Sequence, residues 1–179
     1  MKNWRTLSRE TVLDAGKFLK VEMHKVEFDD GTLIDDWPWV VAPDYVNIVT
    51  ETHEGTYIVF RQQKYALEEA AYSIVGGYVE RGEDPALAAR RELMEETGYE
   101  AEEWIELGSY VVDANRGFCK GHFYFAKGAR RIQDPDANDL EAYEILFLTK
   151  DELLQAVTDG RFAVISWAAA VGLALPHIL

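Results

Sequence analysis

The segment "GGYVERGEDPALAARRELMEETGY" (residues 76–99) decides the fold of this chain, because it joins a glycine turn to a sharply delimited helix. Asp84 is a favourable N-cap residue, and Pro85 suits the first helical turn. Gly98 is the residue type that most often follows the last helical turn. We therefore expect a helix from Pro85 to Thr97.

The polar side of this predicted helix is crowded with carboxylates. At about 100° per residue, small and apolar side chains share one side and Glu92, Glu95 and Glu96 share the other. Carboxylates three or four residues apart repel one another. Arg91 precedes Glu95 by four residues and can pair with it, and we expect no cation within a helical turn of the others.

Two explanations of this crowding compete. A solvated acidic face is the usual one for a surface helix. Here, however, paired glycines precede the helix, and they let the backbone turn tightly and expose its carbonyl groups. Hard divalent cations such as Mg²⁺ bind carboxylate and carbonyl oxygens. The sequence therefore favours a metal site, in which the bound cation offsets the repulsion.

Composition limits the classes of function. The chain has 179 residues and 48% hydrophobic residues, which suits a single folded domain. A net charge of −14 argues against a general binder of nucleic acid or anionic membranes. Cys119 is the only cysteine, so an internal disulfide is excluded. We expect Cys119 to act as a small apolar residue in a strand, and we expect the protein to work in a reducing, cytoplasmic compartment. The four histidines (His24, His53, His122, His177) lack zinc-site spacing.

The two ends of the chain carry no predicted membrane or export signal. The first residues lack the apolar run of a signal peptide. The apolar tail contains Gly172 and Pro176 and has no basic flank. We expect it to form a core-packed helix from Phe162 to about Leu175, stopped by Pro176, rather than a membrane anchor.

The remaining pattern is that of an α+β protein. Residues 17–28 predict a strand with a bulge near His24–Lys25, and the turn "DDGT" leads into a returning strand that Pro38 marks as an edge. A second hairpin is joined across "HEG", and "AYSIVGG" predicts one strand running straight into the glycine turn. Further strands are expected at "WIELGSYVV", "GHFYFAKG" and "YEILFLT", and helices at "KDELLQAVTDG" and the tail. The arrangement is a mixed sheet with helices and an N-terminal antiparallel hairpin.

Residues 77–99 resemble the signature of the Nudix hydrolase family, G-x5-E-x7-R-E-U-x-E-E-x-G-U, with U an aliphatic residue. The matching positions are Gly77, Glu83, Arg91, Glu92, Leu93, Glu95, Glu96 and Gly98, and only Tyr99 departs, at the final aliphatic position. The order of strands and helices also fits over most of the chain. The resemblance implies an α/β/α sandwich, with residues 1–42 as an N-terminal β extension and residues 43–179 as the catalytic core.

The resemblance also implies metal ligands and their supports. Glu92 and Glu96 match the principal ligands, Glu95 a third or assisting ligand with a catalytic role, and the carbonyl of Gly76 a frequent addition. Arg91 matches a residue that orients the glutamates. Structural positions of the motif fall on Gly77, Glu83 and Gly98. The family uses Mg²⁺, for which Mn²⁺ can substitute, to hydrolyse a nucleoside diphosphate linked to another group.

In the sugar-nucleotide hydrolases that this sequence resembles, the general base often comes from an acidic loop well after the motif, and "DPDANDLEAYEILFL" is such a loop. We assign Glu141 as an additional metal ligand, and Asp139 or Glu141 as the base that activates water. The alternative is that Asp134, Asp136 and Asp139 only form a polar turn, which aspartates favour.

The substrate class rests on residues outside the motif. The N-terminal hairpin and "RQQKY" resemble the ADP-ribose and nucleotide-sugar branch, whose members commonly form homodimers through their N-terminal strands. Arg61 is a candidate phosphate contact, and Trp37, Trp39 and Tyr45 are candidates for stacking a base, although each aromatic also suits a core or interface. Two features depart from that branch. The strand before the motif ends in "SIVGG" where the branch usually has a Pro-Ala-Gly-like ending, and the segment "DANRGFC" lacks the proline usually found beyond the motif. These departures favour a nucleotide-sugar pyrophosphatase over a strict ADP-ribose enzyme.

Three alternatives stay open at this point. The substrate can be a dinucleoside polyphosphate or a modified nucleotide. The chain can be a nucleotide-binding module without turnover, although such modules usually have a degenerate motif. The acidic helix can also be a solvated face of a structural protein.

Overall fold

The computed structural model describes residues 4–135 and 143–179. The chain divides into two compact units. The first contains the residues up to Asp44 together with Tyr110–Gly121, and the second contains Tyr45–Ser109 and His122–Leu179.

The first unit is built on an antiparallel sheet of three strands in the order β1-β2-β3. These are β1 (Trp4–Asp14), β2 (Lys20–Phe28) and β3 (Leu33–Val41). A register shift between His24 and Val26 confirms the predicted bulge, and Pro38 lies on an edge strand as expected. The expected hairpin is present, but β1 was not anticipated. Every residue of β1 is exposed, so its sequence has no alternation of buried and exposed positions to detect.

The second unit contains a mixed set of strands in the order β11-β5-β4-β10-β8, with β6 beside β5, β7 beside β4 and β9 beside β10. A single strand was expected over 71–77. It is instead broken at Ile74 into two short segments, because the first pairs with β5 and the second with β4. The bounds are β4 (Tyr45–Thr52), β5 (Tyr57–Gln62), β6 (Ala71–Ser73), β7 (Val75–Tyr78), β8 (Tyr99–Glu100), β9 (Glu103–Asp113), β10 (Phe118–Arg131) and β11 (Tyr143–Leu148).

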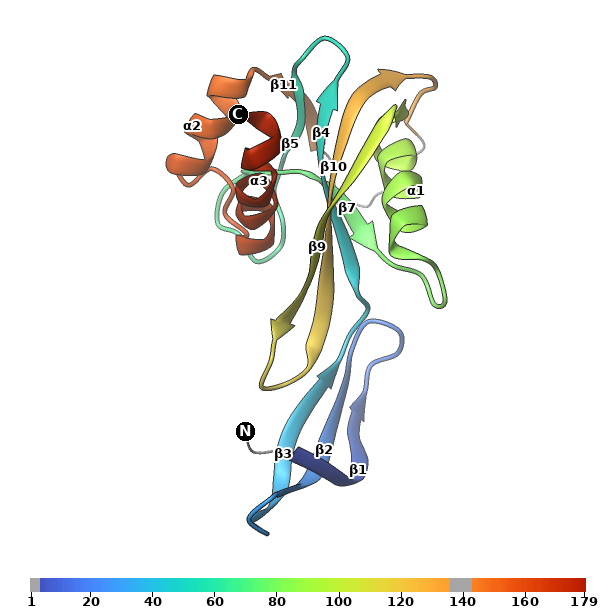
Figure 1. Cartoon of the computed structure of the whole chain (residues 1–179), viewed down its shortest axis with the longest axis vertical. Coiled ribbons are helices and arrows are strands. Elements are labelled where there is room, and N and C mark those ends of the chain that lie inside the picture. Colours follow the sequence, from blue (N-terminus) through green and yellow to red (C-terminus); the bar gives the residue numbers. More distant parts are fainter. Residues whose placement is uncertain (1–3, 136–142) are drawn as a thin grey trace. The chain divides into compact units, whose positions relative to one another are not determined.

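Helices cover both faces of this sheet, which confirms the α/β/α arrangement (Figure 1). Helix α1 (Pro85–Thr97) lies on one face, and α2 (Lys150–Thr158) and α3 (Ile165–Ile178) lie on the other. Each face has its own apolar core. Leu93 packs with Ile48 and Val75 on the α1 side, whereas Val49 and Phe125 pack with the two C-terminal helices.

The helix α1 has the ends that its sequence predicts. The Asp84 side chain accepts a hydrogen bond from the Ala86 amide at 2.8 Å. Gly98 adopts a left-handed conformation with φ of 75°, and its amide donates to the Met94 carbonyl at 2.8 Å. A side chain at Gly98 would also collide with the Gln133 carbonyl oxygen, 2.1 Å from its Cβ position. These contacts fix the register of the glutamates on the helix.

The tail differs from the expectation at both ends. Helix α3 begins at Ile165 rather than Phe162, and it continues to Ile178 with Pro176 inside it. A proline there removes one backbone bond in the last turn only, and the buried side chains of Ala174 and Ile178 hold that turn against the core. Within the described ranges, no helix is long and apolar enough to cross a membrane.

Candidate functional site

Arg91 is the centre of a charged cluster on α1. Its guanidinium donates to both carboxylate oxygens of Glu83, at 2.9 and 3.0 Å. It also donates to Glu92 at 2.7 Å and, as expected, to Glu95 at 3.0 Å. The expectation that Glu92 has no nearby cation is therefore wrong, because the guanidinium fork reaches its sequence neighbour as well.

The electrostatics of this cluster differ from one carboxylate to the next. The hydrogen bonds from Arg91 lower the pKa of Glu83. The pKa of Glu92 is instead raised, chiefly by burial, and the hydrogen bond from Arg91 opposes that shift only in part. A second cation near Glu92 would favour its charged form.

The two glycines before α1 bring the backbone close to the glutamates. A Cβ atom on Gly77 would lie 2.3 Å from the carboxylate carbon of Glu92, so a side chain there would displace Glu92. The amide of Gly76 donates to Oε2 of Glu96 at 3.1 Å. The backbone of β7 is thus in direct contact with the carboxylates of Glu92 and Glu96 on α1.

The oxygen atoms gathered here suit a hard divalent cation. Within residues 4–135 and 143–179, no three acidic, histidine or cysteine side chains already converge on one point. Glu92 and Glu95 pair with Arg91 instead, and the Glu96 carboxylate accepts a hydrogen bond from the Gly76 amide. Carboxylate and peptide oxygens are nevertheless the donors that Mg²⁺ prefers, and the glutamates lie on one side of one helix. The donor set therefore fits a hard divalent cation of the Mg²⁺ type.

The expected distal acids, Asp139 and Glu141, lie outside the described residues, as does Asp136. Asp134 pairs with Arg131 at 2.8 Å and is 96% exposed at its side chain. The chain is described again from Tyr143, whose hydroxyl donates to the backbone carbonyl of Glu96 at 3.1 Å. The residue that follows the acidic loop is therefore bonded to the same glutamate that Gly76 holds.

Two of the expected substrate contacts lie in the second unit. Arg61, on β5, is exposed and pairs loosely with Glu144 at 3.7 Å, so its guanidinium is available to a phosphate. Tyr45, on β4, is half-buried, and its ring lies edge-on to Phe123 at 6.3 Å. Its role in packing is visible, and a role in binding a base stays a prediction.

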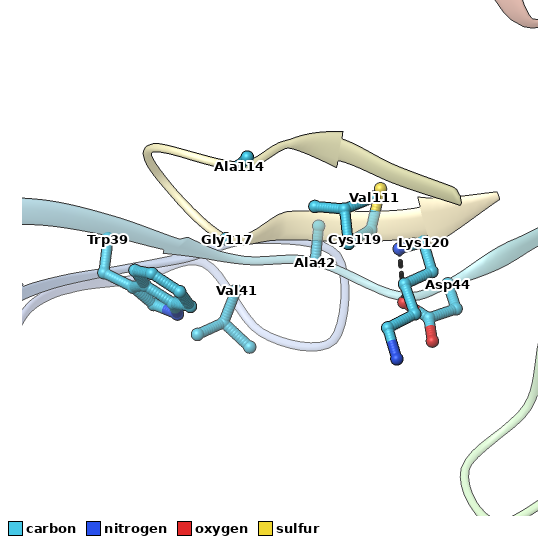
Figure 2. Close-up of a pocket in the computed structure, with 9 residues that line it drawn as sticks. All are labelled: Trp39, Val41, Ala42, Asp44, Val111, Ala114, Gly117, Cys119 and Lys120. Atoms are coloured by element: carbon cyan, nitrogen blue, oxygen red, sulfur yellow. Dashed lines mark hydrogen bonds between the residues drawn. The ribbon is translucent and has the colours of Figure 1, made fainter. Parts of the chain in front are cut away.

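Trp39 belongs to the first unit, where it borders a pocket of about 450 Å³. One face of its indole stacks on His24 at 5.1 Å, and Gly117 lies so close that a Cβ there would be 1.8 Å from the ring. At the opposite end, the Lys120 amide donates to Asp44 (Figure 2). Between these ends the wall is mainly apolar and includes Val41, Ala42, Val111 and Cys119.

Cys119 is buried, and burial raises the pKa of its thiol to about 11. This agrees with the expected small apolar strand residue, since a thiol that stays protonated is a weak nucleophile.

Trp37 packs edge-on against Trp4 at 4.9 Å, and its indole N–H donates to the Asn115 carbonyl at 2.7 Å.

Two residues that contact Glu96 or Gly76 were missed from the sequence. Tyr143 gave no signal, because an aromatic residue in a predicted strand is ordinary. Asn47 did give one: it interrupts the apolar run at the start of β4, residues 45–49, and it is only 4% exposed.

Known proteins resemble this chain in sequence and in fold. Residues 42–168 match the family model described as the NUDIX domain. The methanol dehydrogenase activator of Bacillus methanolicus is 31% identical over 160 residues, which cover 88% of this chain and 84% of that protein. The ADP-ribose pyrophosphatase of Bacillus subtilis (strain 168) is 26% identical over 154 residues, covering 86% and 82%.

A solved structure described as an ADP compounds hydrolase superposes with a TM-score of 0.83 at 20% identity, covering 98% of this chain and 94% of that one. This likeness confirms the fold. The family match, which covers most of the chain, and the signature, which departs only at Tyr99, identify the chain as a member of the Nudix family and an enzyme of its pyrophosphohydrolase type.

Proposed function

We propose that this enzyme uses Mg²⁺ to cleave the pyrophosphate bond of a nucleoside diphosphate linked to a sugar or a similar group. The products are a nucleoside monophosphate and a sugar phosphate. The observation that carries the proposal is the placement of the glutamates of α1 against the glycine turn, with Glu96 bonded to Gly76 and Glu92 seated over Gly77.

In this proposal Glu92, Glu95 and Glu96 hold the metal, and the carbonyl of Gly76 assists them. Residues of an antiparallel strand direct their N–H and C=O groups to the same edge. Since the Gly76 N–H points to Glu96, its carbonyl is expected on that edge too. Arg91 keeps Glu92 and Glu95 oriented through its hydrogen bonds. The bound cation would lower the pKa of a water molecule and balance the charge of the phosphates.

A proton acceptor for the attacking water is still required. We assign it to Glu141 or Asp139, with Glu141 as a further metal ligand and Glu95 as an assisting group. Tyr143 supports this choice, because the hydrogen bond from its hydroxyl to Glu96 keeps the start of β11 beside the glutamates.

The nucleotide-sugar class is supported by relatives. One is named an ADP-ribose pyrophosphatase, and a mouse protein that is 26% identical is named an ADP-sugar pyrophosphatase. Arg61 has the exposure needed to contact a phosphate. Tyr45 and Trp39 are each proposed to stack on the base. The single buried thiol fits a reducing, cytoplasmic site of action.

We further propose that the enzyme is a homodimer in which the exposed strand β1 is covered by a second copy. The exposed apolar side chains on β1 are Trp4, Leu7, Val12 and Leu13. A three-stranded sheet needs an apolar face that is covered, and exposed apolar patches of this kind mark interaction sites.

The proposal is tested by release of nucleoside monophosphate from ADP-ribose, ADP-glucose, GDP-mannose, UDP-glucose and a dinucleoside polyphosphate. Each substrate is assayed with Mg²⁺, with a chelator, and with the Glu96→Gln variant. We expect metal-dependent cleavage of a sugar nucleotide, reduced on the order of 100- to 1,000-fold in the variant. Cleavage of the dinucleotide alone would retain the mechanism and reject the sugar-nucleotide class. Silence across the panel in folded protein would reject both.

A second candidate function is activation of an alcohol dehydrogenase, because one relative is named a methanol dehydrogenase activator. Dehydrogenases of many kinds bind nicotinamide dinucleotides, which contain a pyrophosphate. Adding NAD to the substrate panel, free and bound to an alcohol dehydrogenase, separates the two candidates. Cleavage or activation confined to the dehydrogenase-bound form would favour the activator role.

A further inference from the structure

A buried amide lies against the glycine turn on the face of the sheet opposite to α1. Asn47 lies in the middle of β4, between Val46 and Ile48, which pack on the α1 side. Because side chains alternate along a strand, Asn47 lies on the other face, with Val49. Among the described residues, its Nδ2 atom is buried and has no hydrogen-bond partner. An apolar side chain would avoid this cost, so the amide requires an explanation.

The explanation begins with the residue across from it. Asn47 pairs with Gly76 in the β4–β7 ladder. A Cβ atom on Gly76 would lie 2.6 Å from the Asn47 side-chain oxygen and 2.4 Å from the Val46 carbonyl oxygen. Gly76 is absent from the residues with positive φ, so glycine is needed here for space rather than for backbone conformation.

Because neither glycine has a side chain, each leaves space for one polar side chain, and the two spaces lie on opposite faces of β7. Gly77 makes room for the Glu92 carboxylate, and Gly76 makes room for the Asn47 amide. Gly76 also carries the N–H that holds Glu96. The Asn47 oxygen therefore lies against the backbone of the residue that connects the sheet to the metal-binding helix.

We propose that Asn47 is a positioning residue for the Gly76 peptide. Contact between its side-chain oxygen and the Gly76 Cα restrains the peptide so that the N–H binds Glu96 and the carbonyl faces the same edge. The unpartnered Nδ2 is then a cost in stability that accompanies this role. The inference rests on the proposed function, because the restrained peptide matters through the metal site.

The first test compares Asn47→Val with Thr50→Val. Thr50 is a matched control: it lies on the same strand but on the other face, it is fully buried, and its hydroxyl has no partner among the described residues. Both variants remove a buried polar group, so neither should lower the melting temperature.

We expect Asn47→Val to need about 10-fold more Mg²⁺ than wild type for the same rise in melting temperature without substrate. We also expect kcat to fall about 10-fold with little change in KM. Thr50→Val should match wild type in both measurements. If Asn47→Val matched Thr50→Val in Mg²⁺ response and kcat, the inference would be overturned.

A second test measures the contact itself through the Gly76→Ala substitution. In the wild-type background the added methyl group meets two oxygens, and in the Asn47→Ala background it meets one. We expect Gly76→Ala to lower the melting temperature less in the second background. Equal effects in both would contradict the contact. A wild-type protein without Mg²⁺ response or turnover would reject the proposed function instead, and this double-mutant comparison would still report on Asn47 and Gly76.

Discussion

The two sheets of this molecule differ in how much of their surface the chain itself buries. In β4 of the second unit, six of eight residues are buried, and apolar side chains line both faces. In β1 of the first unit, all 11 residues are exposed. Both strands contain β-branched and aromatic residues, so intrinsic strand preference does not account for the difference.

The difference lies in what covers each strand. Helices on both faces of the sheet complete the core of the second unit, and the packing of α1 against its face fixes the position of the helix that carries the glutamates. No helix belongs to the described part of the first unit, and aromatic contacts such as Trp4 with Phe28 at 4.3 Å replace a core there. The apolar core of the second unit is therefore formed within one chain, whereas the exposed apolar side chains of β1 are the reason for our proposal that a second copy covers the first sheet.

The sharpest test of this contrast is a pair of leucine substitutions. Leu93 is fully buried on α1, and Leu7 on β1 is 42% exposed. We expect Leu93→Ala to lower the free energy of unfolding by about 2–5 kcal/mol, because it leaves a cavity. Leu7→Ala should change it by less than about 0.5 kcal/mol in dilute, monomeric protein. Urea unfolding followed by circular dichroism measures both, and equal losses would show that β1 is already covered within the chain.

A charge on β1 tests the proposed covering by a second copy. We expect the double substitution Val12→Asp with Leu13→Asp to weaken dimerisation about 100-fold, on the order of 2–3 kcal/mol, because it removes apolar contact and adds repulsion. Sedimentation equilibrium measures the dissociation constant. Ser8→Asp, at an already polar position of the same strand, is the control. A wild-type protein that is monomeric at all concentrations would contradict the dimer.

The smallest expected effect concerns acid stability. Hydrogen bonds from Arg91 lower the pKa of Glu83 from its ordinary value of 4.5. The ionised carboxylate therefore stabilises the folded state fully at pH values above 4.5, and this contribution is lost as the pH falls through the lowered pKa. Glu83→Gln should therefore be less stable than wild type near pH 7, with a difference that shrinks below pH 4.5. Melting temperatures across this range test it. A difference independent of pH would assign the effect to packing rather than charge.

Local signals explain what the sequence predicts well. The ends of α1 follow from Asp84, Pro85 and Gly98, each of which acts through contacts within one turn. The spacing of the glutamates then places them on one side of the helix. These features need no knowledge of the rest of the fold.

Features that depend on distant contacts escape such reasoning. The break at Ile74 depends on two different partner strands, and the continuation of α3 past Pro176 depends on packing against the core. Strand β1 has no burial pattern at all. The reach of Arg91 to Glu92 and the contact of Asn47 with Gly76 depend on side-chain geometry, although a lone Asn in the apolar first half of β4 marks the latter position.

The central claim is that the glutamates of α1 are crowded together because they bind a divalent cation. Thermal unfolding of wild type and Glu96→Gln, each titrated with Mg²⁺ without substrate, tests it most directly. Binding predicts a melting temperature that rises with Mg²⁺ in wild type, corresponding to about 2.7 kcal/mol at 100 times the dissociation constant. Glu96→Gln should need far more Mg²⁺ for the same rise. A wild-type melting temperature that does not depend on Mg²⁺, or an equal response in the variant, would contradict the account.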